Sequence, residues 1–69
     1  MKLSARNQLK GKIVSINKGA VNAIVKLDIG GGNVVSSTIS LDAINELNLK
    51  EGMEAYAIIK ATSVMIGIE

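Results

Sequence analysis

The sequence predicts an all-β domain that carries one short helix. Its apolar residues are dominated by Ile, Val, Leu and Ala, and Tyr56 is the only aromatic residue among the 69. Side chains branched at Cβ suit the pleated surface of a β-sheet. Short apolar runs alternate with turns that contain Gly, Asn or Asp, and Pro is absent. This punctuation is typical of a series of short strands.

Five strands are expected, and two glycine-containing turns separate the first three. Residues 17–20 form the first turn, where Gly19 is able to adopt a positive φ. Three consecutive glycines followed by Asn33 close a hairpin between the second and third strands. The expected strands cover residues 4–16, beginning near Ser4, and residues 21–29, 34–39, 55–60 and 63–68.

The helix is expected between the third and fourth strands. Ser40 stands where a capping residue is preferred, and Asp42 lies in the first turn, where negative charge is favourable. Leu41, Ile44 and Leu47 recur at every third position, which fits a short helix that packs one apolar stripe on a sheet. Five strands with a helix in this place match the element order of a five-stranded OB-like Greek-key barrel.

Composition limits what this single domain of residues 1–69 can do. A chain of this size buries only about 60% of the surface that its unfolded form exposes, yet 48% of its residues are hydrophobic. Part of the apolar surface is therefore expected between the subunits of a homo-oligomer. Cys and His are absent, which removes thiolate metal sites and the usual general base. No signal peptide or membrane-spanning run is recognisable, so a cytoplasmic location without a membrane partner is expected.

Two polar clusters offer hydrogen-bond donors for an anion. In an extended segment, Ser4 and Arg6 point to the same side and set a hydroxyl beside a guanidinium, a pair suited to a tetrahedral oxyanion. Taken alone, each cluster is more often a solvated strand or a polar connection than a binding site. The second cluster combines an ammonium group, two hydroxyls and backbone N–H groups, and consists of Lys60, Ala61, Thr62 and Ser63.

The donor-rich character of both clusters selects among anions. A fully ionised oxyanion only accepts hydrogen bonds, whereas hydrogen phosphate must also donate a proton. A pocket built from these clusters is therefore expected to favour molybdate, tungstate or sulfate over phosphate. Sulfate differs from molybdate in size rather than in hydrogen bonding, so pocket size must separate these two.

Other polar features carry weaker signals. The turn at Gly19, Ala20, Val21 and Asn22 exposes N–H groups, and a plain hairpin turn is the favoured interpretation there. The glycine run lacks the Gly-Lys-Ser/Thr ending of a phosphate-binding loop and leads into no helix. The six carboxylates are scattered without the spacing of a metal cage or an acid/base pair. Catalysis is therefore not predicted.

Three segments together resemble one known family. They are residues 4–13 (SARNQLKGKI), residues 18–22 (KGAVN) and residues 56–65 (YAIIKATSVM). In this order they closely resemble the molbindin (Mop) family of molybdate- and tungstate-binding TOBE/OB-type domains, and the resemblance covers the whole chain. An ordered set of motifs is more specific than any one of them, and it outweighs the plainer interpretations of the two donor clusters.

The resemblance implies a fold, an assembly and two classes of site. The fold is an OB-like barrel, and free-standing single-domain members form hexamers built as trimers of dimers. The implied function is non-catalytic binding and storage of molybdate or tungstate, with no organic cofactor and no directly coordinated metal ion. One class of site lies at a subunit interface, with Ser4, Ala5 and Arg6 from one subunit and Lys60, Ala61, Thr62 and Ser63 from a partner. A second class near the threefold axes is assigned to Gly19, Ala20, Val21 and Asn22.

A nucleic-acid-binding OB domain is the main alternative. The net charge of +2 and the sequence pI of about 9.2 are compatible with it. Such domains usually stack bases on aromatic side chains, and Tyr56 alone does not form that platform. No nucleic-acid partner is therefore expected, and a purely structural oligomerisation module is the remaining non-enzymatic alternative.

Overall fold

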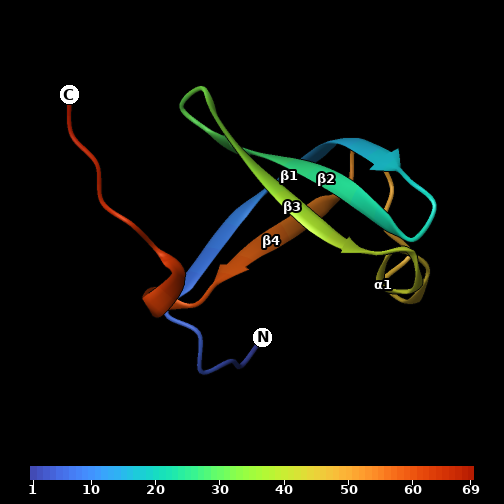
Figure 1. The fold of residues 1–69 in the computed structure, drawn as a ribbon, viewed down its shortest axis with the longest axis horizontal. Coiled ribbons are helices and arrows are strands. Elements are labelled where there is room, and N and C mark those ends of the chain that lie inside the picture. Colours follow the sequence, from blue (N-terminus) through green and yellow to red (C-terminus); the bar gives the residue numbers. More distant parts are fainter.

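The computed structural model describes residues 1–69 and consists of one curled antiparallel sheet with a short helix at one end (Figure 1). Four strands lie in the order β3-β2-β1-β4, so that the last strand returns beside the first. This is the strand order of a Greek key, and the predicted all-β, OB-like fold class is confirmed. The elements are β1 (Asn7–Lys18), β2 (Asn22–Gly30), β3 (Asn33–Ser40), α1 (Leu41–Glu46), β4 (Glu54–Ile59) and the 3-10 turn η1 (Ala61–Ser63).

The long strand β1 organises the sheet because it pairs with a different neighbour along each half of its length. Its first half, from Asn7 to Lys12, is antiparallel to β4, and its second half, from Lys12 to Lys18, is antiparallel to β2. The register shifts between Ile13 and Ser15, which marks a β-bulge. A bulge bends its strand and increases the local twist. The sheet therefore curls around a common interior.

The glycine run forms the hairpin that the sequence predicts. Gly31 and Gly32 join β2 to β3 and have φ angles of 62° and 79°. Two positive φ angles in a two-residue loop match the turn type whose twist suits a β-hairpin. The end of β2 is fixed as well, since the Gly30 N–H donates a hydrogen bond to Oδ1 of Asp28 at 2.9 Å.

The interior is small, and α1 closes one end of it. Ser40 caps the helix as predicted, since its Oγ accepts a hydrogen bond from the N–H of Ala43 at 3.0 Å. None of the helices is both long enough and apolar enough to pass through a membrane. The buried residues are Ile13, Ala23, Val25, Leu27 and Ile44. Of these five, Ile44 comes from the helix.

Two strand predictions are wrong. β1 begins at Asn7 rather than near Ser4; Ser4 and Arg6 lie in bends, and residues 4–6 have no strand partner. The fifth strand predicted at residues 63–68 is absent: Ser63 belongs to η1, and residues 64–69 leave the sheet (Figure 1). A strand needs a neighbour that satisfies its backbone groups, and within one chain these residues have none.

Replacing Ile44 by Ala tests whether the helix is attached through this one side chain. Ile44 is 3% exposed and packs in the core cluster, and truncating a buried Ile costs about 2–5 kcal/mol. We expect the free energy of unfolding to fall by that amount in urea denaturation. The matched control is Ile24→Ala, because Ile24 is 42% exposed and its loss is expected to cost less than half as much. Equal losses in the two variants would contradict this account.

Candidate functional site

The start of β1 and the end of β4 bring two polar segments together. Asn7 and Ile59 are cross-strand neighbours at this end of the sheet. The side-chain Nδ2 of Asn7 also donates a hydrogen bond to the carbonyl oxygen of Ile59 at 3.2 Å. Arg6 precedes the first of these residues and Lys60 follows the second. Both predicted donor clusters therefore lie at the same end of the sheet, where Figure 1 shows the N-terminal segment beside η1.

The N-terminal donor segment is bent and exposed. Ser4 and Arg6 each lie in a bend, so the side-chain alternation of an extended strand does not apply to them, contrary to the sequence argument. The side-chain Nε2 of Gln8 donates a hydrogen bond to the carbonyl oxygen of Ala5 at 3.1 Å. This bond ties the bent segment back to β1 and leaves the Ser4 hydroxyl and the Arg6 guanidinium exposed.

The second donor segment turns the chain at the end of β4. Residues 61–63 form η1, in which the Ser63 N–H donates a hydrogen bond to the carbonyl oxygen of Lys60 at 2.9 Å. The first N–H groups of such a turn have no acceptor inside it, so those of Ala61 and Thr62 are available to a ligand. The ammonium group of Lys60 and the hydroxyls of Thr62 and Ser63 are exposed beside them.

The two segments together present donors and positive charge but no carboxylate. Arg6 and Lys60 supply two formal positive charges, and residues 4–6 and 60–63 include no acidic side chain. No group of three or more His, Cys, Asp or Glu side chains that could hold a metal ion occurs in the structure. The donor set therefore fits an anion that accepts hydrogen bonds, and it differs from a carboxylate-lined cation site.

The third predicted cluster lies at the opposite end of β1. A hydrogen bond from the Gly19 N–H to the carbonyl oxygen of Asn22, 2.8 Å long, closes this turn. The turn borders an open hollow of about 410 Å³, which Lys18, Ala20 and Val21 also line. Gly19 does not have the positive φ that the sequence suggested. A Cβ there would lie 3.2 Å from the Asn22 oxygen, so a larger residue would require this oxygen to shift by a few tenths of an ångström.

Comparison with known proteins assigns this geometry to a family. Residues 3–66 match the model of the TOBE domain family. Over 69 residues, the chain is 75% identical to a probable molybdenum-pterin-binding protein of Haemophilus influenzae, and the match covers 100% of both chains. The chain belongs to the molbindin family of TOBE domains.

Solved structures agree with the molbindin assignment. MopII from Clostridium pasteurianum is similar with a TM-score of 0.90 at 55% identity, over 97% of this chain and 100% of that chain. ModG, a cytoplasmic molybdate-binding protein with molybdate bound in the solved form, is similar with a TM-score of 0.93 at 45% identity. The match covers 100% of this molbindin-family chain and 49% of ModG.

Two amide side chains have structural roles that the sequence did not reveal. Asn7 and Gln8 stand in the N-terminal molbindin motif directly after Arg6. This position was the only indication in the sequence that either side chain has a structural role. Their acceptors are the carbonyl oxygens of Ile59 and Ala5. The acceptor of Asn7 lies on another strand, and it is therefore known only once β1 and β4 are paired.

We expect Asn7→Ala to loosen the junction between the two donor segments. The lost hydrogen bond is worth about 1 kcal/mol net, and amide hydrogen exchange of the last β4 residues should become faster. Gln8→Ala is the control, since its bond stays within the N-terminal segment and should leave β4 protected. Unchanged β4 exchange in Asn7→Ala would show that this bond does not hold the junction.

Proposed function

We propose that this chain binds molybdate, and also tungstate, reversibly and without catalysing a reaction. The observation that carries the proposal is the pairing of Asn7 with Ile59, which brings residues 4–6 beside residues 60–63. The names of relatives support the choice of ligand: the probable molybdenum-pterin-binding protein of Haemophilus influenzae is 75% identical, and ModG has molybdate bound. The oxyanion is the cargo of this site, and the proposal includes no organic cofactor.

Charge and hydrogen bonding together hold the anion in this proposal. Arg6 and Lys60 balance the two negative charges, while the N–H groups of residues 61 and 62 donate to its oxygens. Hydrogen bonds to an ionised acceptor are roughly twice as strong as those between neutral groups. Further donors are the hydroxyls of Ser4, Thr62 and Ser63. All these interactions are non-covalent, so the anion leaves without a chemical step.

The chemistry of the donors sets the selectivity. Hydrogen phosphate carries a proton that needs an acceptor, and neither donor segment has a carboxylate to provide one. Sulfate accepts hydrogen bonds in the same way as molybdate, and it is the smaller ion. We therefore propose that donor chemistry discriminates against phosphate and that the size of the assembled pocket discriminates against sulfate.

The site is proposed to lie at a subunit interface, with residues 4–6 of one chain facing residues 60–63 of a partner. Because the β1–β4 pairing puts both segments at the same end of each chain, two chains that meet through this end would bring the segments together across the interface. In one chain the charged and hydroxyl side chains of both segments are exposed, so water screens them. A second subunit that excludes this water would strengthen each hydrogen bond. We propose a homohexamer built as a trimer of dimers, with a second class of site at Gly19, Ala20, Val21 and Asn22 near the threefold axes.

The proposed cellular role is storage and homeostasis of molybdate in the cytoplasm. Reversible, non-covalent binding suits uptake and release of an anion. The chain lacks His and Cys, which are common general bases and nucleophiles in enzymes. Binding alone is therefore the activity that this donor set supports best.

Isothermal titration of the purified protein tests the ligand. We expect saturable heat with molybdate and with tungstate at physiological salt, and little response to sulfate or phosphate. The site has no carboxylate to accept the proton of hydrogen phosphate, and sulfate is too small for the pocket. Absence of heat with both molybdate and tungstate would refute the proposed function. Equal affinity for sulfate would refute selection by size.

The variant Arg6→Ala tests the position of the site. We expect its molybdate dissociation constant to rise more than tenfold, because a charge and a planar set of donors are lost together. The matched control is Lys50→Ala, which removes one positive charge from the turn before β4, outside both donor segments, and should change the affinity less than twofold. Unchanged affinity in Arg6→Ala would rule out the assigned site, and the oligomer is expected to persist in both variants.

A further inference from the structure

The Gln8 side chain holds the peptide group that precedes Arg6. Its Nε2 donates a hydrogen bond to the carbonyl oxygen of Ala5 at 3.1 Å. The chain has no cis peptide bond, so the C=O and the N–H of each peptide group point in opposite directions. Because the Ala5 oxygen is turned toward Gln8, the N–H of Arg6 points away from Gln8. This N–H has no acceptor within the chain.

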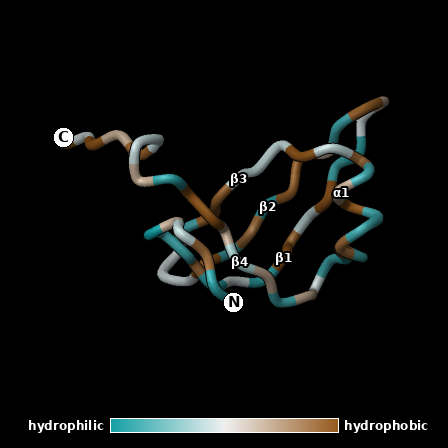
Figure 2. Tube along the Cα trace, turned by 90° about the horizontal axis from the view of Figure 1, so that it is seen from below, coloured by the Kyte–Doolittle hydropathy of each residue, from teal (hydrophilic) through white to brown (hydrophobic).

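No other hydrogen bond or ion pair holds the N-terminal donor segment. Residues 1–6 lie outside the sheet, and none of their backbone groups pairs with another backbone group. The ion pair of the chain joins Lys10 to Glu54. Figures 1 and 2 show the chain beginning at the periphery of the molecule, and Ala5 alone among residues 1–6 is half-buried. The conformation of residues 4–6 therefore depends on Gln8.

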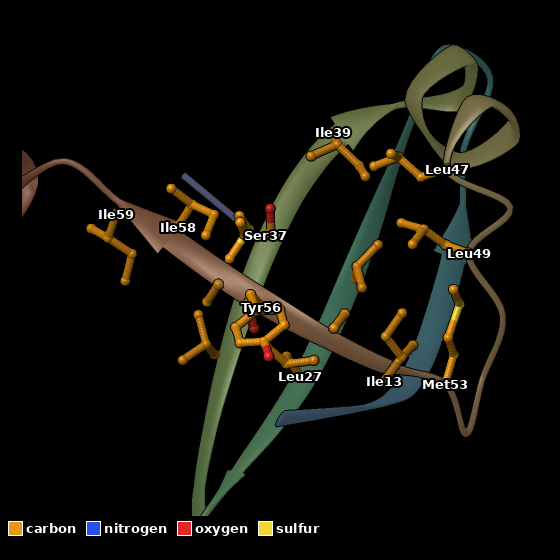
Figure 3. A pocket seen from close by; sticks show the side chains of 16 residues that line it. Ile13, Leu27, Ser37, Ile39, Leu47, Leu49, Met53, Tyr56, Ile58 and Ile59 are labelled. Carbon is orange, nitrogen blue, oxygen red and sulfur yellow. The ribbon is translucent and has the colours of Figure 1, made fainter. Parts of the chain in front are cut away.

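The peptide group that precedes Lys60 is fixed in a similar way but from two directions. The Asn7 side chain donates to the carbonyl oxygen of Ile59, so the N–H of Lys60 points away from Asn7, and it also has no acceptor within the chain. Figure 3 shows Ile59 among the side chains that line an apolar pocket of about 720 Å³. Ile59 is thus held by its side chain and by its carbonyl group, whereas the N-terminal segment relies on one amide.

We propose that Gln8 is a positioning residue that makes the N-terminal segment a donor-only half of the anion site. Its amide turns the Arg6 N–H toward the oxyanion and keeps the Ala5 carbonyl oxygen away from it. The inference rests on the proposed anion site and adds a structural origin for its discrimination against phosphate.

Loss of the amide would change the chemistry of the site. The peptide group between Ala5 and Arg6 would then be free to rotate, and its carbonyl oxygen would face the anion in part of the population. A carbonyl oxygen repels a fully ionised oxyanion, which only accepts hydrogen bonds, whereas it can accept the proton of hydrogen phosphate. Gln8 therefore affects the two kinds of anion in opposite directions.

The variant Gln8→Leu tests this role, because leucine keeps a side chain of similar size without a donor. We expect its molybdate dissociation constant to rise about fivefold, as for one lost hydrogen bond, and its phosphate dissociation constant to stay the same or fall. Calorimetry measures the first constant, and competition with molybdate measures the second. A residue that only stabilised the fold would weaken both anions alike. An unchanged ratio of the two constants would therefore overturn the proposal.

A rescue variant and a matched control accompany this measurement. Gln8→Lys supplies an ammonium donor for the Ala5 carbonyl, and its ratio of phosphate to molybdate dissociation constants should stay within about twofold of the ratio in the unmodified protein. Asn45→Leu removes an exposed amide from α1, outside both donor segments, and should leave both constants unchanged. Equal loss of selectivity in Gln8→Lys and Gln8→Leu would overturn the role of the donor.

NMR provides a second measurement that does not need phosphate. In the absence of any anion, the ¹³C resonance of the Ala5 carbonyl should shift in Gln8→Leu, and the response of the Arg6 amide to molybdate should be smaller than in the unmodified protein. Unchanged Ala5 and Arg6 signals would overturn the proposal. Failure of the unmodified protein to bind molybdate would overturn the proposed function and this inference together, whereas molybdate binding with unchanged selectivity in Gln8→Leu would overturn the role of Gln8 alone.

Discussion

The pairing of β1 with β4 is the constraint on which the rest of the molecule depends. β1 is shared between two neighbours, and its first half is held only by β4. The same pairing sets Arg6 beside the start of η1, with the Asn7 side chain fastening the junction. The proposed anion site, made of segments from the two ends of the sequence, is thus a consequence of sheet topology, and residues 4–6 need no strand structure of their own.

A second constraint is the shortage of interior. Five residues are buried, whereas fifteen large hydrophobic residues are exposed, so a single chain covers little of its apolar surface. The open edges of β3 and β4 add unpaired backbone groups to this deficit. Self-association would cover apolar surface, and it would also exclude water from donors that are exposed in one chain. In this account the stability of the assembly and the strength of anion binding have the same origin.

Local signals in the sequence predicted most of the fold. The Ser40 cap, the glycine hairpin and the β-branched runs each depend on neighbours a few residues away, and all three are confirmed. The start of β1 and the fifth strand were predicted wrongly, since strand formation at Ser4 or Ile66 depends on a partner strand that sequence does not specify. The site residues came from the motif order, whereas the role of Asn7 required its acceptor, Ile59, from the far end of the chain.

The central claim is that residues 4–6 and 60–63 form one anion site. An NMR titration of the ¹⁵N-labelled protein with molybdate tests it most directly, because the amides of Ala5, Arg6, Ala61 and Thr62 are followed separately. The account predicts that all four shift along one binding curve with a common dissociation constant. Shifts confined to one segment, or curves with different constants, would contradict a site that both ends of the sequence build together.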